Sequence, residues 1–228
     1  MKTSTVTAIV SAYYAESFLE GRLSNLLSQA PVPEVIVVCQ DGSIEHKIAT
    51  KFADVVVITT PDVPTIYRAW NIGVEAAHGE YLTNANCDDR LYPGALRHLA
   101  GILDDNPQAG IAYANSDIVT TIDGLPVNRF EWLDGGFAEL QYACFVGPMP
   151  MWRKELHSLY GLFDEELRVA GDYDFWLRVV SQGQQLRHSG RSVGAYLRRP
   201  DSAEHRESLR TLVETARVRS RYTKGVSE

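Results

Sequence analysis

Short apolar runs alternate with segments of helical spacing through the first half of the chain. Val6–Val10 and Val35–Cys39 are apolar without polar alternation, which is typical of strands covered on both faces of a parallel sheet. Between them, apolar side chains from Phe18 to Leu27 recur at helical spacing. The first residues therefore predict a strand, a helix and a second buried strand.

The same pattern continues as far as Asn115. We expect further strands at Val55–Ile58, Glu80–Ala85 and Ile111–Ala114. We expect further helices at Ile44–Phe52, Pro64–Ala77 and Leu96–Leu103. Because strands alternate with helices, this half predicts a doubly wound α/β sheet.

After Asn115 the pattern changes. The segments on either side of Asp123-Gly124, a turn dipeptide, predict a short antiparallel hairpin. Beyond it we expect a helix near Asp172–Ser181, strands near Gln185–His188 and Val193–Leu197, and a closing helix from about Ala203. We expect one domain over residues 1–228, in which the halves 1–115 and 116–228 meet near Asn115.

Composition narrows the class of protein. With 228 residues of which 45% are hydrophobic, the chain is able to bury a full core. Its 22 Lys and Arg against 29 Asp and Glu give a net charge of −7, which excludes a general attraction to nucleic acid. The three cysteines are odd in number and lack metal-ligand spacing, and no apolar run approaches the roughly 20 residues that span a bilayer. We expect a cytoplasmic protein without disulfides, zinc or a transmembrane segment.

Two adjacent acids, Asp88 and Asp89, follow the strand expected at Glu80–Ala85. Adjacent carboxylates repel each other, so the pair requires either full hydration or a hard cation such as Mg²⁺ or Mn²⁺ between it and a ligand. Without a cation, the pair is a solvated acidic loop that caps the helix starting near Pro93. The chain lacks a glycine-rich phosphate loop after its first strand, so a cation on the acid pair is one way to neutralise a bound phosphate.

Polar residues also follow the first two strands, where ligands of open parallel sheets bind. Ser11–Glu16 comes after the first strand and Asp41-Gly42-Ser43 after the second. Asp41 is suited to accept from a base N–H or a ribose hydroxyl, but an ordinary Asx turn explains it equally well.

Several short motifs, in a fixed order over about residues 6 to 200, resemble family 2 glycosyltransferases, enzymes of the GT-A fold that use nucleotide-diphospho-sugars. The motifs are Val10–Tyr14 with Glu16, Asp41–Ser43, Ala69–Gly73, Ala77–Leu82 leading to Asp88-Asp89, Gly161–Asp164 and Gly171–Arg178. The resemblance implies a GT-A-like (Rossmann-like), mostly parallel central sheet flanked by helices, with a smaller acceptor-side lobe that contains the hairpin.

The resemblance also implies roles for the acids. Asp41 contacts the nucleoside, Asp89 binds a Mn²⁺ or Mg²⁺ ion, and Asp88 either contacts the ribose or shares that ion. Asp172 is the general base that takes a proton from an acceptor hydroxyl in a single, inverting displacement. The alternative for Asp172 is a helix N-cap.

Further substrate-binding residues are less specific. Ala12 and Tyr14 follow the first strand and line the nucleotide pocket in the resemblance. Asn71 either bridges that pocket to the acid pair or is a buried amide that ties loops together. Trp152 either stacks on a sugar or packs under a loop, and Arg198 either pairs with the diphosphate or lies exposed at the rim.

The chain departs from the family pattern at several positions. Gln40 and Asn86 replace acids, and Gly171 replaces a glutamate. Arg198-Arg199 stand where a histidine often completes the metal site. Either Arg199 or His205 is the candidate to take its place, and we expect His205 to be a surface or capping residue.

The closing helix carries Leu209, Leu212, Val213 and Ala216 on one face, with arginines around it. We expect this face to pack on the domain. The alternative is peripheral contact with an anionic membrane, which would suit a lipid-linked substrate.

The sequence thus predicts an inverting, metal-assisted glycosyltransferase with a nucleotide-diphospho-sugar donor and a saccharide or lipid-linked acceptor. A binding module of the same fold without turnover is the alternative, motivated by Gly171 and Asn86. A nucleotidylyltransferase is a weaker hypothesis, since no glycine-rich loop with a catalytic Arg or Lys follows the first strand.

Overall fold

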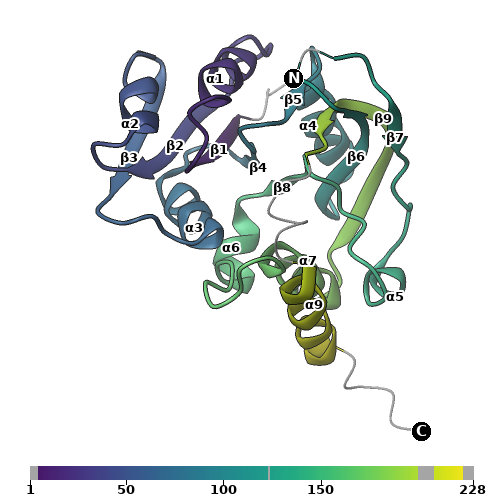
Figure 1. Cartoon of the computed structure of the whole chain (residues 1–228). Helices are drawn as coiled ribbons and strands as arrows, with labels where there is room; N and C mark the ends of the chain where they lie inside the picture. Colours follow the sequence, from purple (N-terminus) through teal and green to yellow (C-terminus); the bar gives the residue numbers. More distant parts are fainter. Residues whose placement is uncertain (1–4, 123, 200–207, 223–228) are drawn as a thin grey trace, which may run out of the picture.

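The computed structural model describes residues 5–122, 124–199 and 208–222. These residues form a nine-stranded sheet with helices on both faces (Figure 1). The strand order is β3-β2-β1-β4-β8-β6-β9-β5, and β7 pairs with β6 off this path. The predicted α/β class is confirmed. His205 and Asp123, on which two expectations rested, fall outside the described residues, as does the expected helix start at Ala203.

The bounds of the elements are as follows. The strands are β1 (Val6–Ala12), β2 (Glu34–Gln40), β3 (Val55–Thr60), β4 (Tyr81–Asn84), β5 (Arg90–Leu91), β6 (Ala109–Val119), β7 (Asn128–Phe130), β8 (Met151–Arg153) and β9 (Gln185–Leu197). The helices are α1 (Leu19–Leu27), α2 (Ile44–Ala49), α3 (Ile66–Ala76), α4 (Ala95–Asp105), α5 (Phe137–Leu140), α6 (Glu155–Tyr160), α7 (Gly171–Ser181) and α9 (Ser208–Tyr222).

The strands β1 to β4 are parallel, as predicted, and β1 lies between β2 and β4. Ile9 is the register partner of Ile36 in β2 and of Asn84 in β4. Ala8 and Val10 face a core that contains α1 and α4, whereas Ile9 faces a second core that contains α3 and α7. Because both faces of β1 are covered, its sequence shows no polar alternation.

The second half joins this sheet through β8, which is antiparallel to both β4 and β6. The predicted hairpin is present as the antiparallel pair β6 and β7. Asn115, where we expected the two halves to meet, lies inside β6. The chain therefore crosses this position in a continuous strand.

The expectation of two separate strands at Gln185–His188 and Val193–Leu197 is wrong, because β9 runs unbroken from Gln185 to Leu197. The polar segment around Gly190 has the composition of a turn, but it stays beside β6. Register shifts between Ala114 and Asn115 absorb the irregularity.

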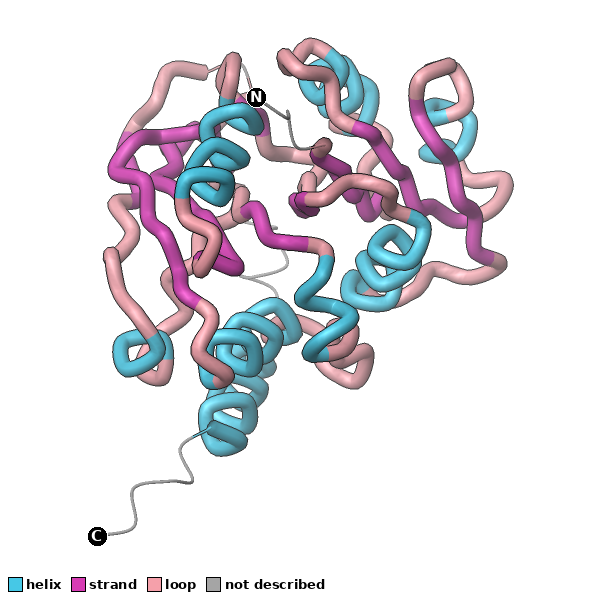
Figure 2. The backbone as a smooth tube through the Cα atoms, turned by 180° about the vertical axis from the view of Figure 1, so that it is seen from behind, coloured by secondary structure: helices cyan, strands magenta, loops and turns pink. Residues whose placement is uncertain are grey.

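The helices divide between the faces of the sheet. The side chains of α1, α2 and α4 enter one core, and those of α3, α6, α7 and α9 enter the other. Seen from behind, the helices α7 and α9 stand together at one end of the molecule, away from the strands β1 to β3 (Figure 2). Within the described part of the chain, no helix combines the length and apolar character needed to cross a bilayer.

Candidate active site

The loops after β1, β2 and β4 meet at one edge of the sheet, as the sequence predicted. Parallel pairing of β1 with both neighbours brings their carboxyl ends together. The amide of Ala85 donates to the carbonyl of Ile9 at 2.8 Å, and the thiol of Cys87 lies 3.6 Å from the carbonyl of Ser11. The loop that carries the acid pair is therefore fixed against the end of β1.

The other two loops present different groups at this edge. The whole of residue Ala12 is buried, backbone included, so the structure leaves no surface of Ala12 for the expected substrate contact. Tyr14 is exposed and has a left-handed backbone with φ 54°. Asp41 is exposed and lies 3.4 Å from Nδ1 of His46, while Ser43 caps α2. Asp41 is thus accessible to a nucleoside, and the capping role of this motif belongs to Ser43.

The two acids of the pair occupy different environments. Asp89 is 1% exposed; its Oδ2 accepts from Nδ2 of Asn86 at 3.1 Å and its Oδ1 from the amide of Leu197 at 3.4 Å. Burial, with repulsion from Asp88, raises the pKa of Asp89 to about 7. The side chain of Asp88 is partly exposed, and no described residue donates to its Oδ1. Asp88 is therefore the accessible acid of the pair, whereas Asp89, of which the metal contact was expected, is buried.

Arginines surround the acid pair. Nη2 of Arg199 lies 2.8 Å from Oδ2 of Asp88, and its guanidinium lies 4.8 Å from the ring centroid of Phe18. Arg22 is buried, and burial lowers its pKa to about 10 despite the attraction of Asp89. Positive charge that could meet a diphosphate is thus held beside the pair, and Arg199 is the arginine in contact with Asp88.

The carboxylate oxygens of the acid pair fit a cation that is coordinated by the protein and a substrate together. Within the described ranges, no group of three His, Cys, Asp or Glu side chains gathers into a self-sufficient metal site. Mg²⁺ is commonly held by one or two carboxylates together with substrate phosphates, and Asp88 offers such a carboxylate oxygen. The residues therefore fit a cation that arrives with a diphosphate.

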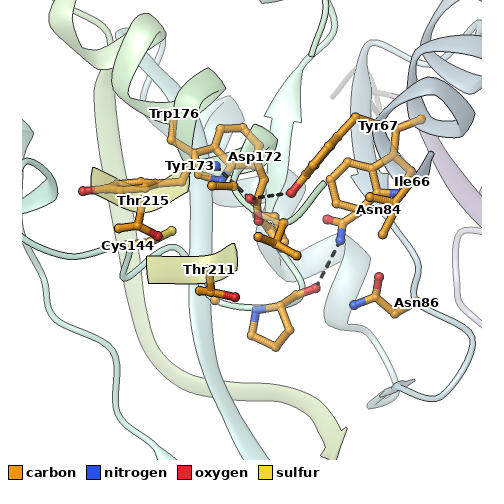
Figure 3. A pocket seen from close by; sticks show the side chains of 16 residues that line it. Ile66, Tyr67, Asn84, Asn86, Cys144, Asp172, Tyr173, Trp176, Thr211 and Thr215 are labelled. Carbon is orange, nitrogen blue, oxygen red and sulfur yellow. Dashed lines mark hydrogen bonds between the residues drawn. The ribbon is translucent and has the colours of Figure 1, made fainter. Parts of the chain in front are cut away.

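A cavity of about 340 Å³ connects this loop to α7 (Figure 3). Asp172, near the start of α7, and Asn86, in the acidic loop, both line it. The aromatic side chains of Tyr67, Trp70 and Trp176 contribute much of its wall. The expected base and the loop of the acid pair thus share one cavity.

The carboxylate of Asp172 is held by two donors on one oxygen. Its Oδ1 accepts from the hydroxyl of Tyr67 at 3.1 Å and from the backbone amide of Tyr173 at 2.8 Å. The side chains of Asp172 and Tyr67 point toward one another in Figure 3. No described residue donates to Oδ2. Burial raises the pKa of Asp172 above its ordinary value, and the two hydrogen bonds oppose that rise. Asp172 lies inside α7, whose N-cap is Ala170, so it does not occupy the N-cap position.

Two expected substrate-binding residues are structural. Trp152 is 0% exposed, and its Nε1 donates to Nε2 of His157 at 2.9 Å, so the stacking of Trp152 on a sugar is wrong. Asn71 is buried and forms hydrogen bonds of 3.0 and 2.9 Å with the carbonyl and amide of Phe163. The alternative for Asn71, an amide that ties loops together, is the one the structure supports.

Arg198 and Arg199 point to different places. The guanidinium of Arg198 lies 5.7 Å from the ring centroid of Phe130, and its side chain is exposed. Its amide donates to the carbonyl of Val119 at 2.9 Å. Arg198 is thus a rim residue, and Arg199 alone of the two contacts the acid pair.

Several residues of the cavity lie outside the motifs, and three of them are polar side chains close to Asp172 or on α9. Tyr67 precedes the motif at Ala69–Gly73 by two positions, and its place on the same helix was the available signal. Thr211 and Thr215 reach the cavity from α9, far along the chain. No local pattern links them to Asp172, because the docking of α9 brings them there.

Comparisons with known proteins give matches in sequence and in fold. Residues 7–117 match the family model described as glycosyl transferase family 2. An uncharacterized glycosyltransferase of Rickettsia typhi is 26% identical over 186 residues, a match that covers 77% of this chain and 58% of that protein. Chondroitin synthase of Pasteurella multocida is 25% identical over 186 residues, which cover 78% of this chain and 19% of the synthase. The chain thus corresponds to only part of these relatives.

Two solved structures share the fold. S. aureus TarS 1-349 in complex with UDP-GlcNAc has a TM-score of 0.78 at 18% identity, over 98% of this chain and 68% of that one. The mannosyltransferase PcManGT from Pyrobaculum calidifontis, in complex with GDP-Man and Mn²⁺, has a TM-score of 0.72 at 18% identity, over 99% of this chain and 66% of that one. At this identity the similarity establishes the GT-A fold.

Proposed function

We propose that this chain, which belongs to glycosyl transferase family 2, transfers a sugar from a nucleotide-diphospho-sugar to a hydroxyl of a saccharide or lipid-linked acceptor. The observation that carries the proposal is the cavity that Asp172 shares with Asn86 of the acidic loop. A base and a donor-binding loop on one cavity allow two substrates to be held for direct transfer.

In the proposed reaction, Oδ2 of Asp172 takes the proton of the acceptor hydroxyl as that oxygen bonds to the anomeric carbon. The bond between this carbon and the diphosphate oxygen breaks on the opposite face, and the nucleoside diphosphate leaves with the electron pair. One such displacement inverts the anomeric centre. The raised pKa of Asp172 supports this role, because it makes the carboxylate a stronger base than an exposed one.

The donor is proposed to bind at the edge formed by β1, β2 and β4. Asp41 is exposed there for contact with the nucleoside. The guanidinium of Arg199, beside Asp88, is placed to form charge-assisted hydrogen bonds with the diphosphate. A divalent cation on Asp88 would supply further neutralisation of the charge that develops on the leaving diphosphate. Asp89 holds the loop in place through Asn86 and the amide of Leu197.

The test begins with a thermal-shift panel of UDP-, GDP-, dTDP- and CDP-sugars, each with and without Mn²⁺. With the donor identified, Asp172→Asn should lower the transfer rate by about 10²- to 10⁴-fold, the range that general bases contribute. Its donor Kd should stay within about twofold, because the amide of Asn keeps the oxygen that accepts from Tyr67 and Tyr173. A variant that retains turnover removes Asp172 as the base. Donor binding by the unaltered chain without transfer or donor hydrolysis supports the binding module instead.

A further inference from the structure

The C-terminal helix α9 is attached to the domain through one face. Val218 on that face is fully buried. The carboxylate of Glu214 accepts hydrogen bonds from the amides of residues 168 to 170, at 2.9 to 3.2 Å, just ahead of α7. The guanidinium of Arg221 lies 2.7 Å from Asp174 and 2.9 Å from Asp164. These contacts fix the rotation of α9 about its axis.

The opposite face of α9 is apolar and exposed. We call it the outer face, and define it by Leu209, Leu212, Val213 and Ala216. Leu209, Leu212 and Val213 are 78%, 70% and 68% exposed, and Ala216 is exposed as well. The expectation that this face packs on the domain is therefore wrong: the anchors of the inner face turn it to solvent. At about 100° per residue its four members fall within one arc of the helix, so they form a continuous apolar stripe.

The charge on α9 is opposite to that of the chain. Residues 208–222 contain four arginines and one acid, which gives +4 − 1 = +3, whereas the whole chain has a net charge of −7. The single acid, Glu214, is turned inward onto the backbone ahead of α7. By helical geometry Arg217 and Arg219 fall on the two sides of the outer face. Arg217 pairs with the exposed Glu166 at 3.3 Å, and Nε of Arg219 donates to the hydroxyl of Tyr173 at 3.3 Å. Because an exposed ion pair contributes little free energy, Arg217 is able to exchange Glu166 for a lipid phosphate, and the apolar stripe that it borders complements an anionic lipid surface.

The same helix forms part of the candidate active site. Thr211 and Thr215, on the inner side of α9, line the cavity that contains Asp172 (Figure 3). In Figure 1 the helix stands at the end of the molecule farthest from α1 and α2. A surface that contacts the outer face would therefore lie one helix diameter, about 10 Å, from the wall of the cavity.

We propose that the outer face of α9 docks on an anionic membrane surface. The apolar side chains enter the boundary between headgroups and acyl chains, and the flanking arginines stay at the level of the lipid phosphates. The site is independent of the transfer chemistry, because none of the four outer-face residues lines the cavity.

Cosedimentation with vesicles tests the proposal. The full chain should pellet with vesicles of phosphatidylglycerol and phosphatidylcholine, less with phosphatidylcholine alone, and less again as salt rises. The variant L212E/V213E should lower the affinity for anionic vesicles at least about tenfold, since it removes two apolar side chains and adds negative charge. The matched control is Leu125→Glu, which changes an 87% exposed leucine between β6 and β7 and should bind as the unaltered chain does.

Three outcomes would overturn the proposal. They are no pelleting of the unaltered chain, equal loss of binding in the control, and equal binding to both kinds of vesicle.

Sedimentation velocity of the same proteins tests whether a second copy of the chain occupies the outer face instead. A dimer that L212E/V213E dissociates would assign the outer face to that second copy. Circular dichroism reports whether each variant is folded, and the donor thermal shift reports whether it binds donor. These two measurements separate a failure of membrane docking from a failure of the proposed function. A folded variant that binds donor but not vesicles supports docking, whereas failure of every protein to bind donor counts against the proposed function alone.

Discussion

Removing the hydroxyl of Tyr67 should shift the pH at which the enzyme loses activity. In Tyr67→Phe the ring remains, with its contacts to Trp70 and Phe163, while the hydrogen bond of 3.1 Å to Oδ1 of Asp172 is lost. Burial raises the pKa of Tyr67 well above its ordinary value, so the hydroxyl is a proton donor throughout the working range. This hydrogen bond favours the ionised form of Asp172 and lowers its pKa.

The size of the shift follows from that single bond. A hydrogen bond to a charged group contributes about 1.5 to 3 kcal/mol, and a neutral one about 1 kcal/mol. Because the bond in question, at 3.1 Å, is slightly longer than the usual O–H···O hydrogen bond, we take about 1 to 2 kcal/mol. At about 1.4 kcal/mol per pKa unit, its loss raises the pKa of Asp172 by about 0.7 to 1.5. The base works only when deprotonated, so activity at low pH should be lost at a pH higher by this amount.

The assay is the pH dependence of kcat for sugar transfer, from pH 4 to pH 9. The acid limb should move to higher pH in Tyr67→Phe, while the plateau at high pH stays within about threefold, since Asp172 is ionised there in both proteins. Tyr81→Phe is the matched control: it removes a tyrosine–aspartate hydrogen bond of 2.6 Å, to Asp104, on another part of the domain.

An acid limb that stays in place in Tyr67→Phe would refute the reasoning, because the ionisation that limits the rate would then not be that of Asp172. An equal shift in Tyr81→Phe would also refute it. That result would mean that the change comes from general loss of stability and not from the hydrogen bond to the base.

Three further predictions concern the acid pair and α7. The raised pKa of Asp89, about 7, means that its protonated form stabilises the fold; this contribution is complete below about pH 4 and is lost as pH rises through about 7. The free energy of unfolding in urea, relative to Asp89→Asn, should therefore fall between pH 5 and pH 8, and a constant difference would contradict this. Gly171→Ala places a Cβ 2.7 Å from a tyrosine ring and should cost about 1 to 3 kcal/mol in the same assay, whereas Gly101→Ala, in an open helix position, should be neutral or stabilising. Arg199→Ala should weaken donor binding about tenfold or more by calorimetry, and an equal loss in Arg198→Ala would remove Arg199 as the diphosphate contact.

Local sequence was sufficient for the parallel half of the sheet. The apolar runs that became β1 and β2 are covered on both faces, and this local property is visible in their composition. Because β1 lies between β2 and β4 and all three strands are parallel, Asp41 and the acidic loop must lie at the same edge of the sheet.

Local sequence did not determine the environments of single side chains. Asp88 and Asp89 are neighbours of the same type, and their different exposure depends on contacts with β9, which is more than 100 residues away. Trp152 has the composition of a sugar-stacking residue, but the packing of Phe163 and Trp176 around it decides that it is buried. Pairing partners likewise keep β9 continuous through a segment that resembles a turn.

Helix α9 shows most directly which properties the sequence determined and which the tertiary structure decided. Its spacing determined that the helix has an apolar stripe at Leu209, Leu212 and Val213. Spacing does not say which face is covered, because that depends on partners elsewhere in the chain. The tertiary structure decided it: the bonds of Glu214 to the backbone ahead of α7 and of Arg221 to Asp174 outweigh burial of the stripe, so the apolar side chains face outward.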